Sequence, residues 1–138
     1  MKPAAVTPFN IQIGGGSTGN VQPILHEIRH ALEKLVDSGE TSIIDLRSIP
    51  LAPGEEETII DMLGQGEVEA RLNALGLSEI YETQYTGVWL VTHFNESDSI
   101  VSRFIEITGL PDILKSQHED MSRALQRLAI ELQTVHTD

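Results

Sequence analysis

The sequence predicts an α+β domain with a mostly antiparallel sheet of about four to five strands in a meander, packed by an N-terminal and a C-terminal helix. Apolar residues recur at intervals of three and four near both ends of the chain, which is typical of amphipathic helices. From residue 67 to residue 108, apolar and polar residues alternate instead, as they do in half-buried strands. With 138 residues, the chain suits one domain with a real core.

The first helix is predicted over residues 21–37, with Asn20 as its N-cap and Gly39 as its end. We place the centre of its buried stripe at Ile28. The apolar residues within about 80° of Ile28, at 100° per residue, are Ile24, Leu25, Ala31, Leu32, Leu35 and Val36.

A buried strand and a short helix follow. The β-branched run TSIIDL, residues 41–46, predicts the strand. Pro53 and Gly54 interrupt the chain, and three glutamates at positions 55–57 then suit the first turn of a helix, where the helix dipole favours negative charge. We expect that helix to end at the glycines in positions 64 and 66.

The remaining elements are strands and a last helix. EVEARL, residues 67–72, predicts one strand, residues 78–94 predict two strands joined at Thr86-Gly87, and residues 99–108 predict another. The last helix is predicted from the helical spacing of Met121, Leu125, Leu128, Leu132 and Val135.

Residues 1–20 are expected to be a flexible segment or an edge strand, and residues 21–138 to be a single α+β domain. Phe9, Ile11 and Ile13 alternate with polar neighbours, which suits a strand. The glycine run that follows suits a flexible connector.

Composition excludes several classes of function. The net charge is −12, so phosphate backbones and anionic lipids would be repelled, and we expect no nucleic-acid partner. The absence of cysteine excludes disulfides and thiolate metal sites. The sequence has no secretory signal and no apolar run of about 18 residues, which predicts a cytoplasmic protein without membrane insertion. We expect no cofactor.

His26-Glu27-x-x-His30 is the spacing with which zinc hydrolases hold a metal and supply a general base. On the predicted helix, however, His26 and His30 lie about 160° from Ile28 on either side, so both imidazoles point away from the core. A catalytic zinc needs a third ligand and an open coordination position, and Glu55, Glu56, Glu57 and Glu67 are the candidate third ligands. We therefore predict a solvated polar face without metal, and a zinc-dependent hydrolase remains the alternative.

Other candidate sites are weaker. GGGSTGN could bind an anion before a helix, but it lacks the Lys-Ser/Thr ending of a P-loop. His93 lies in a strand pattern, where a hydrogen-bonded structural histidine is the usual explanation. Trp89 lies in GVWLVTHF, a strand that is apolar on both faces. It is either core, if helices cover both faces, or an anchor for a partner, if one face is open.

Five stretches carry a family resemblance in order along the chain: ILHEIRHALEKLVDSGE, IDLRSIPLAPGEEE, LGQGEVEARL, GVWLVTHFN, and RFIEIT followed by PDILKSQHEDM. In these stretches the chain resembles the hydrogenase maturation accessory family called HupH or HyaF, in its C-terminal conserved region. The resemblance implies a non-catalytic, chaperone-like accessory of nickel–iron hydrogenase assembly. Its implied partner is a maturing subunit, above all the small subunit that carries iron–sulfur clusters, or another maturation protein.

The family resemblance implies that HEIRH, residues 26–30, is a surface motif and not a zinc site. Our candidate partner-binding residues are His26, Glu27, His30, Arg47, Glu55 and Trp89. The sequence leaves a homodimer open and does not identify the partner.

Overall fold

The computed structural model describes residues 19–136, in which a five-stranded antiparallel sheet has the order β1-β5-β4-β3-β2. Strands β2 to β5 form the predicted meander, and β1 pairs with β5 at the far edge. Helices precede and follow the sheet in the sequence, so the predicted α+β class is confirmed. The strand suggested by Phe9, Ile11 and Ile13 lies outside the described residues.

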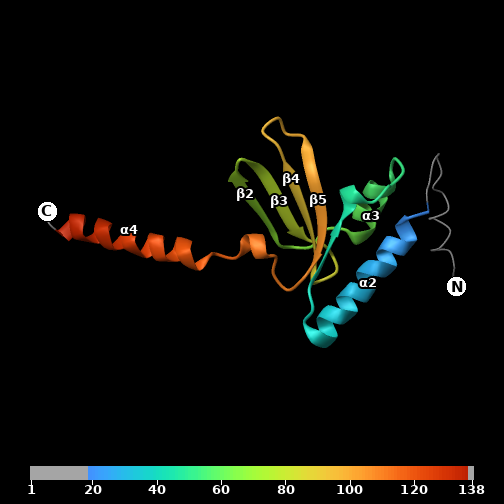
Figure 1. Cartoon of the computed structure of the whole chain (residues 1–138), viewed down its shortest axis with the longest axis horizontal. Coiled ribbons are helices and arrows are strands. Elements are labelled where there is room, and N and C mark those ends of the chain that lie inside the picture. The colour runs from blue at the N-terminus through green and yellow to red at the C-terminus, as the bar shows by residue number, and fades with distance from the viewer. Residues whose placement is uncertain (1–18, 137–138) are drawn as a thin grey trace.

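Within the described part of the chain, the elements match the predicted ranges closely (Figure 1). The helices are α2 (Val21–Ser38), α3 (Glu55–Leu63) and α4 (His118–His136). The strands are β1 (Ser42–Asp45), β2 (Glu69–Ala74), β3 (Gly76–Glu82), β4 (Val88–Phe94) and β5 (Ile100–Ile107). Two short 3-10 helices are η2 (Leu46–Ser48) and η3 (Asp112–Leu114).

Helix α2 buries the predicted stripe against the sheet. Ile24, Ile28 and Ala31 are buried, whereas Val36, at the end of the stripe, is 76% exposed. The helix ends where Gly39 adopts a left-handed conformation with φ 79° and its N–H donates to the carbonyl of Leu35. Apolar spacing therefore sets the buried face, and the glycine ends the helix.

The sheet has two apolar faces because side chains alternate along β4 and β5. Val88 and Leu90 point to the face that α2 and α3 cover, where they share a core with Ile105 and Ile107. Trp89 and Val91 point to the other face and pack with Ile80. Leu72, Phe104 and Leu114 of η3 pack against this second cluster. The chain after β5 thus covers part of the face opposite to α2.

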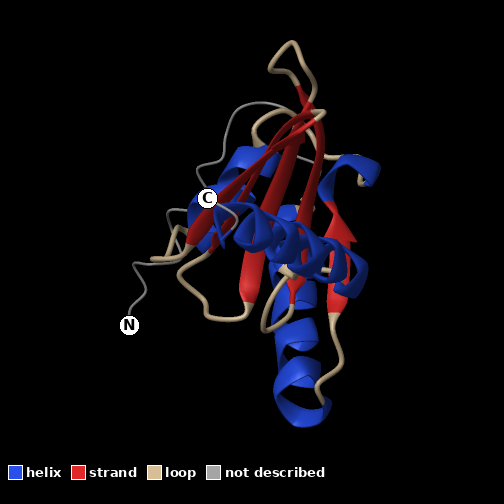
Figure 2. Cartoon of the chain, turned by 90° about the vertical axis from the view of Figure 1, so that its left-hand side faces the viewer, coloured by secondary structure: helices blue, strands red, loops and turns tan. Residues whose placement is uncertain are grey.

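Helix α4 differs from its predicted packing. Every side chain described in α4, residues 118–135, is exposed. Figure 1 shows α4 extending away from the sheet on the side opposite to α2 and α3, and Figure 2, viewed from that side, shows α4 in front of the strands. The helix forms as predicted, but its apolar stripe does not pack on the sheet of this chain.

No helix in residues 19–136 is both long enough and apolar enough to cross a membrane.

Candidate functional site

A groove of about 280 Å³ lies between α2, α3 and the turn that joins β3 to β4. Leu25, Ile28, Leu32, Met62, Leu63 and Val88 supply its apolar lining, and Arg29 and Tyr85 supply its polar groups. The groove is at the small end of ligand-site volumes, which begin at roughly 300 Å³. It suits one large apolar side chain of a partner, with a cation and a phenol beside it.

Gly87 allows the β3–β4 turn to lie against α2. It has φ 93°, a left-handed conformation that favours glycine, and a Cβ at this position would lie 3.2 Å from Cδ1 of Leu32. The turn is held by hydrogen bonds, because the N–H of Gly87 donates to the Glu82 carboxylate at 3.0 Å and that of Tyr85 donates to Thr83 Oγ1 at 3.1 Å. The Tyr85 side chain is therefore presented beside the groove with half of its surface exposed.

His26, Glu27 and His30 are all exposed on α2, so the histidines lie on the outer side of the helix, as the helical angles predict. Arg29 is shared between this polar face and the groove. Arg29 lines the groove, and its Nη2 donates to His30 Nε2 at 3.2 Å. The HEIRH motif and the groove are therefore neighbouring parts of one surface of α2.

The proposed third metal ligands do not gather around the two histidines. Among residues 19–136, no three His, Asp or Glu side chains are grouped so that they could hold a metal ion. Glu56 and Glu57 contact Arg103 instead, and Glu55 binds backbone N–H groups. The donor set around HEIRH is thus an exposed i, i+4 pair, which does not provide the three-ligand site of a catalytic zinc.

Glu55, a predicted partner contact, is only 5% exposed and binds backbone N–H groups of one neighbouring and one distant segment. Its Oε1 accepts from the N–H of Ala52 at 2.9 Å, and its Oε2 accepts from the N–H groups of Gly19 and Asn20 at 3.1 and 3.3 Å. The carboxylate joins the start of α3 to the start of α2. Its geometry is that of a structural link within the fold.

Arg47, another predicted contact, is exposed and belongs to a charge network on α3. Glu56 forms an ion pair with Arg47, Nε to Oε1 at 3.3 Å, and accepts a hydrogen bond from Arg103 Nη1 at 2.8 Å. Arg103 also donates through Nε to Thr92 Oγ1 at 3.2 Å, and its side chain is 15% exposed. Two guanidiniums around one carboxylate fix α3 to the sheet, and Arg47 is the more exposed member.

Trp89 is core rather than surface, with 3% of its area exposed. Its indole N–H donates to the carbonyl of Thr108 at 3.0 Å, which satisfies the polar group of a buried tryptophan. The sequence allows Trp89 to be either a core residue or an exposed anchor for a partner, and in the structure it is a core residue. Trp89 packs with Ile80 and Val91 on the face that Leu114 partly covers.

His93 has the hydrogen-bond partner expected of a structural histidine. Its Nδ1 lies 2.7 Å from Ser78 Oγ on the neighbouring strand β3, and its ring meets Phe104 edge to face with centroids 5.9 Å apart. These residues lie on the sheet face of Trp89. Sequence reasoning did not identify the pairing of Ser78 with His93, because it depends on the register between β3 and β4.

Burial changes the pKa of two titratable groups, and both groups lie outside the HEIRH face. It raises the pKa of Glu106, and the nearby Asp112 raises that pKa further. Burial also raises the pKa of the Tyr81 phenol, while Arg103 lowers it and the carboxylates of Asp61, Glu57 and Glu79 raise it. Neither group lines the groove, so these shifts point to partial burial and not to acid–base chemistry there.

The groove itself was not predicted from the sequence. Its lining comes from three segments that are separate along the chain. In the structure, Leu25 and Leu32 of the α2 stripe are only partly buried, which indicates that this part of the helix is incompletely covered. The structure therefore brings Arg29 and Tyr85 together at a site that no local motif marks.

Comparison with known proteins identifies the family. The family described as "HupH hydrogenase expression protein, C-terminal conserved region" matches residues 18–135. The solved structure of the hydrogenase expression protein HupH from Thiobacillus denitrificans ATCC 25259 is similar, with a TM-score of 0.82 and 36% identity. This similarity covers 86% of this chain and 99% of that one.

Curated relatives carry corresponding names. The chain is 27% identical over 111 residues to the hydrogenase expression/formation protein HoxQ of Azotobacter vinelandii, covering 79% of this chain and 39% of the relative. It is 28% identical over 123 residues to the hydrogenase expression/formation protein HupH of Rhizobium leguminosarum bv. viciae, covering 88% and 44%. The chain thus spans less than half the length of these two relatives. With its fold, its sequence and most of its length matched, the chain belongs to the HupH hydrogenase expression protein family, in the C-terminal conserved region.

Proposed function

We propose that this chain is a non-catalytic accessory of nickel–iron hydrogenase maturation that binds a maturing hydrogenase subunit, in first place the small subunit, or another maturation factor. Family membership supports the hydrogenase pathway, because the relatives are named hydrogenase expression/formation proteins. The predicted cytoplasmic location and the chaperone-like mode of action are part of this proposal.

The apolar groove is the observation that carries the binding role. It is open to solvent between α2 and α3, and its lining is mainly aliphatic. Such a groove can hold an apolar side chain that a partner exposes before its own folding is complete. Arg29 and Tyr85 are the residue types enriched at binding hot spots, and they stand next to the exposed His26, Glu27 and His30.

Co-purification tests the proposal. The tagged chain, expressed in cells that make a nickel–iron hydrogenase, is expected to retain a hydrogenase subunit or maturation protein, identified by mass spectrometry. Tyr85→Ala removes the half-exposed ring beside the groove and should reduce the retained partner at least about fivefold, the effect of losing roughly 1 kcal/mol. Leu75→Ala is the matched control, because Leu75 is 89% exposed and does not line the groove.

Retention of the same partner by the wild-type chain and Tyr85→Ala would argue against the groove. Retention of no hydrogenase-related protein by the wild-type chain would argue against the function itself.

The zinc alternative has a separate test. We expect the purified chain, after washing with a chelator, to hold substoichiometric zinc, and His30→Ala to leave that content unchanged, because the exposed pair lacks a third ligand. Atomic absorption measures the content. One zinc per chain that disappears in His30→Ala would favour a metal-dependent hydrolase instead.

A further inference from the structure

Helix α4 carries an apolar seam that nothing in the described chain covers. Met121, Leu125, Leu128, Leu132 and Val135 follow one another at intervals of four, three, four and three residues. This is the 3.5-residue repeat of a coiled coil, in which Leu125 and Leu132 hold position a and Met121, Leu128 and Val135 hold position d. The five side chains are 51 to 69% exposed. An extended helix with such a seam normally gains its stability from packing against a partner.

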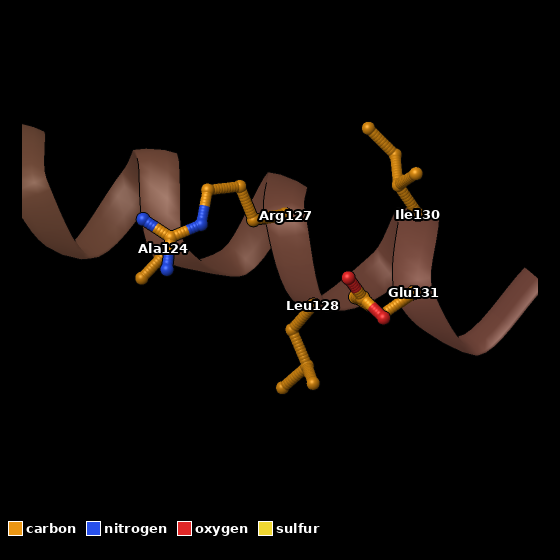
Figure 3. Close-up of a pocket in the computed structure, with 5 residues that line it drawn as sticks. All are labelled: Ala124, Arg127, Leu128, Ile130 and Glu131. Carbon is orange, nitrogen blue, oxygen red and sulfur yellow. The ribbon is translucent and has the colours of Figure 1, made fainter.

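The flanks of the seam suit a second helix at close range. Ser122, Ala124 and Ala129 occupy three of the e and g positions beside the seam, where small side chains let two helix backbones approach. The remaining large apolar residue, Ile130, falls at position f on the outer side. In Figure 3, Leu128 and Ile130 point to opposite sides of α4.

Charge argues for a second copy of this chain and for an antiparallel pair. Within α4, Arg123 and Arg127 nearly balance Glu119, Asp120 and Glu131, so almost all of the net charge of −12 belongs to the rest of the chain. Two copies repel each other least when they meet through α4. The helix is 19 residues long, or about 28 Å, and its N-terminal end carries the sheet domain.

An antiparallel pair therefore holds the two acidic domains at opposite ends, separated by more than the Debye length of about 8 Å. A parallel pair would place them side by side. We propose that the chain forms a homodimer through an antiparallel α4–α4 coiled coil. In the matching register, Leu125 of each copy lies opposite Leu128 of the other, and Met121 lies opposite Leu132. The proposal is independent of any hydrogenase partner.

Sedimentation equilibrium of the purified chain tests the dimer. The wild-type chain is expected to be dimeric, and Leu128→Glu should raise the dimer dissociation constant at least about tenfold, because it places a charge in the apolar seam. Ile130→Glu makes the same chemical change at a residue that is 62% exposed but off the seam, and it should leave the dissociation constant within about twofold. Both side chains are exposed, so neither change disturbs the fold of the sheet domain.

A monomeric wild-type chain would overturn the proposal. The seam would then pack against the chain's own sheet or bind a different protein. The proposal would also be overturned if Leu128→Glu and Ile130→Glu weakened the dimer equally, or if neither weakened it. The interface would then lie elsewhere.

Orientation is tested with cysteines, which the natural chain lacks. Met121→Cys and Leu132→Cys chains are mixed and oxidised, and the products are separated by mass. The antiparallel pair predicts the mixed disulfide as the main product, since a disulfide requires Cα atoms within about 7 Å of each other. Met121→Cys linked mainly to itself would show a parallel pair and overturn the stated arrangement.

Discussion

The Glu55 carboxylate shows how one buried acidic group can join two segments, the one before α3 and the one before α2. It accepts backbone hydrogen bonds from Ala52, three residues before it, and from Gly19 and Asn20, more than thirty residues before it. Hydrogen bonds to an ionised group are stronger than neutral ones, and leaving their donors unpaired inside the protein is costly. We therefore assign Glu55 to stability and leave partner binding to its exposed neighbours.

Glu55→Ala is expected to lower the free energy of unfolding by about 2 to 3 kcal/mol, because it removes the acceptor of the buried Ala52 N–H and of the partly buried N–H groups of Gly19 and Asn20. Urea unfolding followed by circular dichroism measures the change. Glu57→Ala, in the same helical turn but with a side chain that is 68% exposed, should cost less than about 1 kcal/mol. Equal losses in the two variants would contradict the structural role.

Glu106 gives a pH-dependent expectation. Burial and Asp112 raise its pKa in the folded chain, so folding disfavours the carboxylate, and the stability that the protonated form contributes is lost as pH rises through the folded-state pKa. Glu106→Gln should therefore be more stable than the wild type at pH 7, and the difference should shrink towards pH 4.5, the usual glutamate value. Thermal unfolding at the two pH values measures it. A difference that is independent of pH would show that Glu106 does not titrate with folding.

The burial of Glu55 was readable in part from the sequence. Glu55 precedes Ile59 and Leu63 by one and two helical turns, and these three residues are the buried face of α3. What the sequence does not show is the acceptor role, since Gly19 and Asn20 reach the carboxylate only through the tertiary fold. The two interpretations of Trp89 were undecided for a similar reason, because the cover over its face comes from Leu114, far along the chain.

Helix α2 is the element whose packing the sequence predicts best, and one substitution tests its buried face. Ile28→Ala should lower the free energy of unfolding by about 2 to 4 kcal/mol, since Ile28 is buried in the main core. Val36→Ala, in the last turns of the same helix, should change it by less than about 0.5 kcal/mol. Urea unfolding measures both. Similar losses would mean that the helix is rotated from its described orientation.

The elements were predictable where their signals are local. Alternation in GVWLVTHF and the left-handed Gly39 depend on neighbouring residues, so β4 and the end of α2 follow from the sequence. The position of α4 does not, because a stripe such as Leu125-Leu128-Leu132 shows that a helix has an apolar partner and not which surface that partner is. The edge position of β1 likewise depends on its pairing with β5, some sixty residues later.

At the scale of the whole described chain, residues 19–136, the structure is a sheet domain followed by a helix, α4, that contributes no side chain to the core clusters. A chain that ends at Ser116 should therefore keep the unfolding free energy of the full chain at high dilution. At higher concentration, the full chain should gain stability from association while the shortened one does not. Thermal unfolding at several protein concentrations compares them. A large loss of stability at high dilution would show that α4 packs on its own sheet.

The pairing of β1 with β5 also bears on how the protein reaches its native state during synthesis. Ile44 is synthesised about sixty residues before Ile105, the residue it pairs with, and that interval takes roughly 3 to 12 s at bacterial or eukaryotic elongation rates. For that interval, no complete sheet covers the apolar faces of α2 and β1. During that interval we expect the apolar side chains of α2 and β1 to be open to aggregation, and synthesis of β5 ends this period.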